Sequence, residues 1–371
     1  MSGGVVPVAA SNVPISGLPE LLAHLDVLVE DPATPFEAKL FDDVELQLTE
    51  ASIPPLLPTL LPKLTSILKT TQQDPKILVS LILKLLTPVS FSQTLTLADE
   101  SSLIAALSSP APSANVLAMA ILHKAASSAS DAAQLASMPR VLEELIRTWL
   151  SSPDVQVGEK GNKLLGDLLE VDSEIPALQE VRHAVTVDGV AWSSGPVNGQ
   201  NGSRRPTGSG QLWQRITNDS SIFNLLLSLA KGQDPSGATL TAHQTSLAQG
   251  RVLRVLPRLA ALDFGRVARP LGGGDQGQSL LHFASISMVD KKDMLMHLTL
   301  IDYFEALVSL LRIRVDQGGV DNSFITLTLR RIIEEATTDD NVLKAALLGL
   351  PDRTVPEEAD GLRAFVQDIV S

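Results

Sequence analysis

Six histidines are the side chains best suited to bind a metal or transfer a proton, and their spacing supports neither role. They are His24, His123, His183, His243, His282 and His297. No two lie four residues apart, the spacing that places two imidazoles on one helix face, and no His-Glu-x-x-His motif occurs. Cysteine is absent, which excludes thiolate metal sites, a cysteine nucleophile and disulfides. We therefore expect no metal site.

Paired carboxylates and a glycine motif are equally uninformative about catalysis. Neighbouring residues such as Glu143 and Glu144 diverge by about 100° around a helix, so they cannot share an acid–base site. Gly272, Gly274 and Gly277 satisfy G-x-G-x-x-G, but no strand pattern precedes them, as dinucleotide binding requires. No G-x-S-x-G motif occurs. The sequence predicts a protein without catalytic residues and without a cofactor.

An arginine-rich segment has two interpretations. Arg251, Arg254 and Arg258 lie at i, i+3 and i+7, so they form one stripe of a predicted helix. They could dock an acidic partner segment, and they are candidate partner-binding residues on that ground. Alternatively, they pair with carboxylates of the adjacent helical repeat. We favour the intramolecular alternative.

The acidic charge is concentrated in one half of the chain. The formal net charge is −13, and residues 1–190 hold 23 Asp and Glu against 11 Lys and Arg. Binding to nucleic acid needs a basic surface, so we expect none, whereas a basic protein partner fits the first half. Two groups there are candidate partner-binding residues. They are Asp42, Asp43 and Glu45, and Arg140, Glu143, Glu144 and Arg147.

The composition favours helices. Aromatic residues are only 4%, and leucine and alanine carry most of the apolar content. Apolar residues between positions 53 and 68 repeat at helical spacing, although Pro58 and Pro62 should kink or interrupt that helix. Asp74 and Pro75 then precede a second helix, 77–86, which is apolar nearly all round. We predict an all-α fold.

Helix-start signals recur along the chain. The tripeptide Ser-Ser-Pro occurs at 108–110 and 151–153, 43 residues apart, and each copy precedes a predicted helix. Asp234-Pro235 and Asp339-Asp340 are further signals of this kind. A period of about 40–47 residues is typical of HEAT and armadillo repeats, so we predict an α-solenoid of stacked helix pairs. A compact helical bundle with similar caps is the alternative.

The predicted organisation has four parts. Residues 1–17 form a flexible N-terminus, 18–190 a first helical array, 191–211 a glycine- and serine-rich flexible loop, and 212–371 a second array. The most apolar window, 77–86, is about ten residues long, whereas a membrane span needs about 20, and no signal peptide is recognised. We expect a soluble protein of the cytoplasm, with the nucleus as a second compartment.

Three segments resemble a known family. SSPDVQVGEKGNKLLGDLLE (151–170) resembles the second helix of a HEAT-like repeat. FDDVELQLTEASIPPLLPTLLPKLTSILKTT (41–71), followed by DPKILVSLILKLLTP, resembles the opening repeats of fungal proteins labelled DNA mismatch repair armadillo-like. LLHFASISMVDKKDMLMHLTLIDYFEALVSLLR (280–312) resembles a late-repeat segment of the same family. That family is better understood as an assembly chaperone of the proteasome regulatory particle.

The resemblance implies a non-enzymatic α-solenoid. Such chaperones hold the C-terminal domain of an ATPase subunit of the proteasome base, guide assembly of the ATPase ring and block its premature docking on the core particle. No membrane, nucleic acid or small-molecule substrate is implied. The alternative is an armadillo-type transport adaptor that binds basic peptides in a groove lined by Asn and Trp. Trp149, Trp192 and Trp213 do not recur with any repeat period, which disfavours the adaptor.

Overall fold

The computed structural model describes residues 14–175, 207–235, 237, 239–270, 278–318 and 321–370. The chain divides into two compact units, Met1–Ile121 and Leu122–Ser371. The described residues form 19 α-helices and no β-strand, with one isolated bridge between Gln233 and Thr239. The prediction of an all-α protein is therefore confirmed. Residues 1–13 of the predicted N-terminus and 191–206 of the predicted loop lie outside the described residues.

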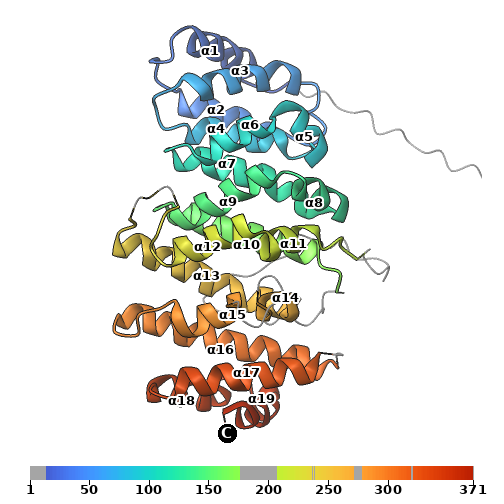
Figure 1. Ribbon diagram of the computed structural model, residues 1–371. Coiled ribbons are helices and arrows are strands. Elements are labelled where there is room, and N and C mark those ends of the chain that lie inside the picture. The colour runs from blue at the N-terminus through green and yellow to red at the C-terminus, as the bar shows by residue number, and fades with distance from the viewer. Residues whose placement is uncertain are drawn as a thin grey trace, which may run out of the picture. The chain divides into compact units, whose positions relative to one another are not determined.

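The first unit contains α1 to α6 and most of α7 (Figure 1). The bounds are α1 Leu18–Glu30, α2 Ala38–Gln47, α3 Leu57–Thr70, α4 Lys76–Leu86, α5 Phe91–Leu97, α6 Glu100–Leu107 and α7 Pro112–His123. Helix α1 packs on α2 and α3, and α4 packs on α2 and α3. Leucines at helical spacing fill the space between them, with Leu21, Leu25, Leu60 and Leu64 fully buried. This periodic burial is what fixes the four-helix arrangement.

Prolines do not interrupt helix α3, which was one of the two effects expected from its sequence. The helix begins at Leu57, so Pro58 lies in its first turn, where backbone N–H groups have no intrahelical acceptor. Pro62 lies inside the helix, which nevertheless continues to Thr70. Burial of Leu60, Leu61 and Leu64 on both sides of Pro62 outweighs the single lost hydrogen bond.

The second unit holds the remaining helices. They are the 3₁₀-helix η1 (Lys124–Ser127), α8 (Ala129–Ala136), α9 (Pro139–Ser151), α10 (Val155–Val171), α11 (Gln211–Asn218), α12 (Ser220–Ala230), α13 (Ala242–Leu262), α14 (Phe264–Ala268), α15 (Leu280–His282), the π-helix η3 (Phe283–Ser287), α16 (Met294–Asp316), α17 (Asn322–Thr337), α18 (Asn341–Leu348), the 3₁₀-helix η4 (Leu350–Arg353) and α19 (Pro356–Val370).

Helix α13 is the centre of the second unit. It packs against α9, α10 and α12 on one side and against α16 on the other, so these helices lie in successive layers (Figure 1). Its 21 residues are buried almost all round between Ala248 and Leu262. A helix without a wide polar face needs neighbours on several sides, and α13 has them. Helices α17, α18 and α19 continue the packing beyond α16.

Helix starts follow the predicted signals at most positions. Helix α7 follows the first Ser-Ser-Pro, and α10 follows the second with Asp154 accepting a hydrogen bond from the Val157 N–H. Asp340 caps α18 in the same way. The prediction that a helix starts after Asp234-Pro235 is wrong. Helix α13 begins at Ala242, where Thr241 is the N-cap and forms a capping box with Gln244. The Asp234 carboxylate pairs with Arg147 instead.

Helix α16 is long and apolar enough to cross a membrane by length and composition. Half of its most apolar window is buried inside the second unit, against α13 and the C-terminal helices. Core helices of soluble proteins pass the same test, so α16 carries no argument for a membrane span. The sequence had pointed to 77–86 as the most apolar window, because α16 mixes its apolar residues with charged ones.

The cap of α18 yields a stability prediction. The Asp340 carboxylate is 4% exposed and pairs with His297 at 2.8 Å and Lys291 at 3.2 Å. Asn also caps helices, so Asp340→Asn removes mainly the charge, and we expect a loss of about 1–3 kcal/mol of unfolding free energy at neutral pH. Asp340→Ala loses the cap as well, about 1 kcal/mol more. Urea unfolding followed by tryptophan fluorescence measures both, because every tryptophan lies in the second unit.

The same variants predict a pH dependence. Burial alone would raise the pKa of Asp340, but hydrogen bonds from the Leu343 N–H, His297 and Lys291 outweigh burial and hold the pKa below its usual value. A lowered folded-state pKa stabilises the protein above the unfolded pKa, and the effect is lost as the pH falls through the folded value. The stability difference between wild type and Asp340→Asn should therefore shrink in strong acid. A difference that stays constant down to that range would contradict this assignment.

Candidate functional site

The predicted arginine stripe lies at the interface of α13 and α10. Arg251 is 7% exposed, and its guanidinium donates hydrogen bonds to the backbone carbonyls of Trp149 (2.6 Å) and Asp154 (2.9 Å). Arg258 is 11% exposed and pairs with Asp167 at 2.8 Å and Glu170 at 2.7 Å. These contacts tie α13 to α9 and α10 through one buried and one nearly buried cation.

The middle arginine differs from its neighbours. Arg254 forms an ion pair with Glu159 of α10 but is 52% exposed. Arg254 and Arg258 thus pair with carboxylates of the adjacent helix, as the intramolecular alternative predicted, while Arg251 uses backbone carbonyls. Of the three, only Arg254 keeps much of its surface in contact with solvent.

Glycines of α10 make room for these side chains. A Cβ at Gly158 would lie within 3.0 Å of Arg251, one at Gly161 within 3.0 Å of Trp149, and one at Gly166 within 3.0 Å of Arg258. Glycine inside a helix costs about 1 kcal/mol relative to alanine, so three in one helix need a packing reason. The guanidinium groups and an indole ring lying directly on the backbone of α10 provide that reason. Sequence reasoning missed these glycines.

Electrostatics at this interface follow from burial and pairing. Burial lowers the pKa of Arg251, with a partial offset from Glu159 and Asp154. Burial would raise the pKa of Asp167, but His123 (2.7 Å) and Arg258 outweigh it and lower the pKa. The Asp167 carboxylate is therefore held charged between two partners, in a structural role.

The predicted group on α9 is also largely engaged inside the second unit. Arg147 lies 3.5 Å from Glu143, 3.6 Å from Glu144 and 3.2 Å from Asp234. Burial raises the pKa of Glu144, although Arg147 opposes the shift. Arg140 is exposed, and no partner is found for it among the described residues. The structure thus joins three of the four residues in one ion-pair cluster with Asp234.

The predicted acidic group on α2, in the first unit, has a different character. Asp42 and Asp43 are exposed, and their carboxylates have no partner among the described residues. Glu45 accepts a hydrogen bond from the Ser80 hydroxyl at 2.9 Å. Leu46, one turn after Asp42, is 84% exposed, the largest exposure among the large apolar side chains described. Helix α2 therefore presents two unpaired carboxylates beside an apolar side chain.

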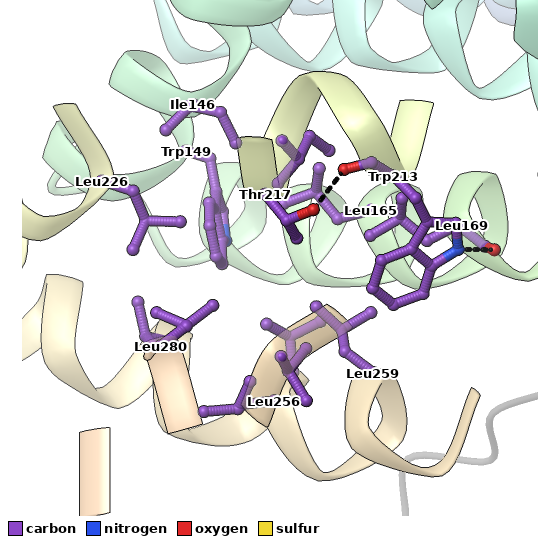
Figure 2. Close-up of a pocket in the computed structure, with 14 residues that line it drawn as sticks. Ile146, Trp149, Leu165, Leu169, Trp213, Thr217, Leu226, Leu256, Leu259 and Leu280 are labelled. Atoms are coloured by element: carbon purple, nitrogen blue, oxygen red, sulfur yellow. Dashed lines mark hydrogen bonds between the residues drawn. The ribbon is translucent and has the colours of Figure 1, made fainter. Parts of the chain in front are cut away.

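A small cavity lies in the core of the second unit. Leu256, Leu259 and Leu280 face Trp149 and Trp213 across it (Figure 2). The space open to the centre of a water molecule is about 20 Å³, and its lining is apolar. A water needs two to four polar partners, so this space stays dry, and it is too small for a substrate. It is a packing defect of the core.

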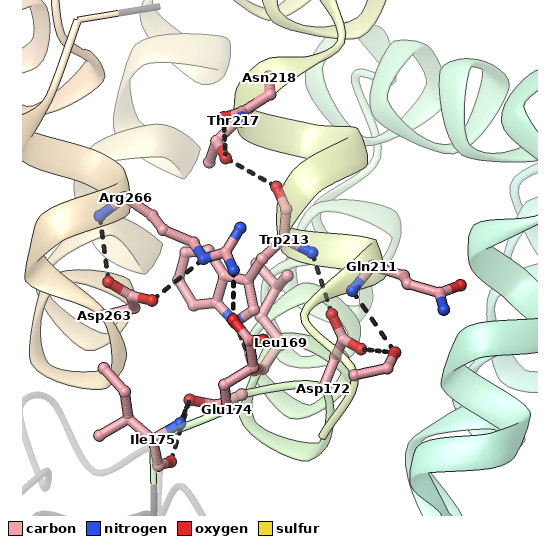
Figure 3. A network of polar contacts seen from close by, with 12 residues as sticks. Leu169, Asp172, Glu174, Ile175, Gln211, Trp213, Thr217, Asn218, Asp263 and Arg266 are labelled. Atoms are coloured by element: carbon pink, nitrogen blue, oxygen red, sulfur yellow. Dashed lines mark hydrogen bonds and ion pairs between the residues drawn. The ribbon is translucent and has the colours of Figure 1, made fainter. Parts of the chain in front are cut away.

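A polar network joins the two ends of the glycine-rich segment (Figure 3). The buried Asp172 carboxylate accepts hydrogen bonds from the backbone N–H of Trp213 (3.1 Å) and from the Ser209 hydroxyl (2.8 Å). The Gly208 N–H donates to the Ser173 carbonyl (2.8 Å), and a Cβ at Gly208 would meet the backbone of Asp172. Residues 172–173 and 208–213 are therefore held side by side.

Arginine and glycine complete that network. Arg266 of α14 pairs with Glu174 at 2.6 Å and with Asp263 at 3.2 Å (Figure 3). Gly210 has φ = 67°, a left-handed conformation that favours glycine, and it precedes α11. The predicted break at 191–211 thus falls within one compact unit, where α10 and α11 from its two sides are in contact.

Among the described residues, no group of three or more His, Asp or Glu side chains could hold a metal ion. Gly272, Gly274 and Gly277 of the G-x-G-x-x-G motif lie outside the described residues. Comparison with protein-family models and with curated proteins gives no match for this chain.

The glycine contacts lead to a paired prediction. Gly161→Ala forces a methyl group against Trp149, and overpacking of this kind typically costs about 1–3 kcal/mol. Gly250→Ala in α13 meets open space, so the better helix propensity of alanine should stabilise the protein by up to about 1 kcal/mol. Urea unfolding followed by tryptophan fluorescence compares the two. Equal effects of the two substitutions would contradict the packing role of Gly161.

The ion pairs lead to a second comparison. Arg258→Ala leaves Asp167 and Glu170 without their buried cation, and loss of one partner of a buried pair costs about 3–5 kcal/mol. Arg254→Ala breaks a half-exposed pair and should change stability by less than about 1 kcal/mol. Thermal or urea unfolding measures both. A large loss in Arg254→Ala would show that Arg254 is structural as well.

Proposed function

We propose that this protein is a non-enzymatic assembly chaperone that binds the C-terminal domain of an ATPase subunit of the proteasome regulatory particle and guides assembly of the base. The proposal rests on the three segments that resemble this chaperone family, 41–71, 151–170 and 280–312. Helices α2, α3, α10, α15 and α16 lie largely within these segments, an arrangement that is consistent with helical repeats. The cytoplasm, and additionally the nucleus, is the proposed location.

The finer architecture is part of the same proposal. We infer that the helices are armadillo/HEAT-like repeats of an α-solenoid. The layered contacts of α10, α13 and α16 in the second unit support that inference. So does the 43-residue period of the Ser-Ser-Pro signals ahead of α7 and α10. Stacked repeats expose long rows of helix faces, and such faces bind proteins in repeat architectures.

The observation that best supports a binding role is the acidic face of α2. Residues 1–121 contain 12 Asp and Glu, five Lys and no Arg. Asp42 and Asp43 are exposed beside Leu46, so a basic partner segment with one apolar side chain fits this face by charge and by burial. Glu143 and Glu144 are weaker candidates, because Arg147 already neutralises them.

The transport-adaptor alternative loses support at its tryptophans. Trp149 is buried and donates to Asn162 Oδ1 at 2.7 Å, and Trp213 is buried and donates to the Leu169 carbonyl at 2.8 Å. Both indoles serve the core, so neither can line a peptide groove. Trp192 lies outside the described residues.

Affinity purification with mass spectrometry tests the function and the surface together. Wild-type protein should recover proteasome ATPase subunits, and Asp42→Lys/Asp43→Lys should recover far less, because the surface then repels a basic segment. The matched control is Glu20→Lys/Glu30→Lys, which changes two exposed carboxylates of α1 by the same charge. Circular dichroism verifies folding, since residues 1–121 contain no Trp or Tyr.

Two results would count against the proposal in different ways. If wild-type protein recovers no ATPase subunit, the chaperone function is wrong. If the α2 variant recovers as much as wild type while the α1 control also does, the function stands and the α2 surface is wrong.

A further inference from the structure

Exposed apolar side chains gather at the start of α16. Met294, Leu295 and Leu298 lie within its first two turns, and they are 78%, 71% and 52% exposed. Among the described residues, no other helix exposes three large apolar side chains. Apolar surface that is left uncovered in this concentration marks an interaction site more often than a scattered exposed leucine does.

Helix α18 lies beside this part of α16 and runs in the same direction. Asp340, the N-cap of α18, pairs with His297 of α16 at 2.8 Å, so the two helices start next to each other. Arg353, which follows α18, pairs at 2.7 Å with Glu305, about two turns after His297. Both ends of α18 are therefore tied to α16 in parallel orientation.

One apolar side chain of α18 extends the exposed surface. Val342 is 61% exposed and lies two residues after Asp340, while Leu298 directly follows the partner of Asp340, His297. We call the surface formed by the four exposed apolar side chains the α16–α18 patch. Its members are Met294, Leu295, Leu298 and Val342.

Unpaired charges of opposite sign flank the α16–α18 patch. Lys292 lies just before α16 and Asp339 just before the N-cap of α18, and both are exposed. Neither charged group has a hydrogen-bond or ion-pair partner among the described residues. The carboxylates next to Lys292 accept backbone N–H groups of the same turn: Asp290 from Lys292, and Asp293 from Leu295. A partner segment of a single charge sign would be repelled by one side of the patch, whereas a surface with the same two signs can match both sides.

We propose that the α16–α18 patch is the interface of a symmetric homodimer, in which α16 of each protomer packs on α18 of the other. In a two-fold dimer one surface serves both copies, so that surface must complement itself. A two-fold axis parallel to the helices and between them exchanges α16 and α18 while keeping their starts at one end. Lys292 then faces the partner's Asp339, and Leu298 faces the partner's Val342.

The balance of forces predicts how salt acts on this dimer. Two chains that each carry a net charge of −13 repel each other, and salt screens that repulsion. The exposed pair of Lys292 with the partner's Asp339 contributes little, so the apolar side chains supply most of the affinity. Dimerisation should therefore strengthen between low and physiological salt. The same net charge disfavours an anionic lipid surface as the occupant.

Sedimentation velocity of the full-length chain tests the interface. The apolar centre is small, so we expect a dissociation constant on the order of 10 μM, the weak end for specific complexes. Leu298→Glu places a carboxylate in the apolar centre of both protomers and should weaken the dimer at least about tenfold. Leu298 is half exposed, so the protein should still fold, which tryptophan fluorescence verifies.

The matched control is Leu327→Glu on α17. Leu327 is 62% exposed, but α17 starts beside the end of α16, where Asn322 donates to the Val315 carbonyl at 2.8 Å. This variant makes the same chemical change away from the patch, and it should dimerise as wild type does.

Charge reversal tests the arrangement of the two protomers. Lys292→Asp and Asp339→Lys should each weaken the dimer about threefold, because each places like charges opposite each other. The double variant Lys292→Asp/Asp339→Lys should regain the wild-type affinity. A merely structural effect of Asp339→Lys at the start of α18 would not be reversed by Lys292→Asp. Additive losses in the double variant would overturn the proposed pairing of α16 with α18.

Two further results would overturn the proposal. One is a wild-type chain that stays monomeric up to about 200 μM. The other is a dimer that Leu298→Glu weakens no more than Leu327→Glu does. If the wild-type chain is monomeric and Leu298→Glu loses recovery of ATPase subunits, the patch binds a different protein. Dimerisation is measured without any partner protein, so its failure is distinct from failure of the chaperone function.

Discussion

The packing of the second unit depends on arginine side chains of α13 lying on glycines of α10. Arg251 and Arg258 can reach carbonyl and carboxylate oxygens because Gly158 and Gly166 have no Cβ. The contact removes most of both guanidinium groups from water, so each needs polar partners there: carbonyl oxygens for Arg251 and carboxylates for Arg258. Such a contact tolerates little change of register, and it fixes how α13 lies on α10. Because α12 and α16 pack on α13, their positions depend on how α13 lies on α10.

Charge therefore has two uses in this chain. In the second unit, most arginines form ion pairs with carboxylates of the same unit, as do Arg147, Arg258 and Arg266. In the first unit no arginine exists, and carboxylates on α2 face solvent without a partner. Internal pairs define the fold, whereas surface charges remain available for another molecule. Arg254, half exposed, and Arg258, nearly buried, lie about one helical turn apart, and both pair with carboxylates of α10.

Much of the fold could be predicted from the sequence, because helix periodicity and capping are local. The helix after Asp74-Pro75 and the one after the second Ser-Ser-Pro begin within two residues of the predicted starts. The start of α13 could not be predicted in this way, since Asp234 prefers Arg147, which is 87 residues distant. The effect of Pro62 was overestimated for a related reason. The free-energy cost of a proline inside a helix is local, whereas the burial of neighbouring leucines that offsets it depends on tertiary contacts.

Prediction of the candidate site was less complete. The pairing of Arg254 and Arg258 followed from residue type and spacing, but their partners on α10 depend on which helices meet. Gly158, Gly161 and Gly166 lie inside a segment whose other residues strongly favour a helix, where glycine is unfavourable. Three such glycines indicate close packing against the helix backbone, and this signal could have identified them from the sequence.

The joined ends at Ser173 and Gly208 have a consequence for how this protein can change in length. Asp172 and Ser173, at the end of α10, are bonded directly to Gly208, Ser209 and Gly210, just before α11, so this contact is made by the described residues alone. The entropic cost of closing a loop grows only with the logarithm of its length, about 0.6 kcal/mol for each doubling. We therefore expect changes in chain length between positions 175 and 207 to cost little folding free energy, so that a new segment could be inserted there without redesign of α10 or α11.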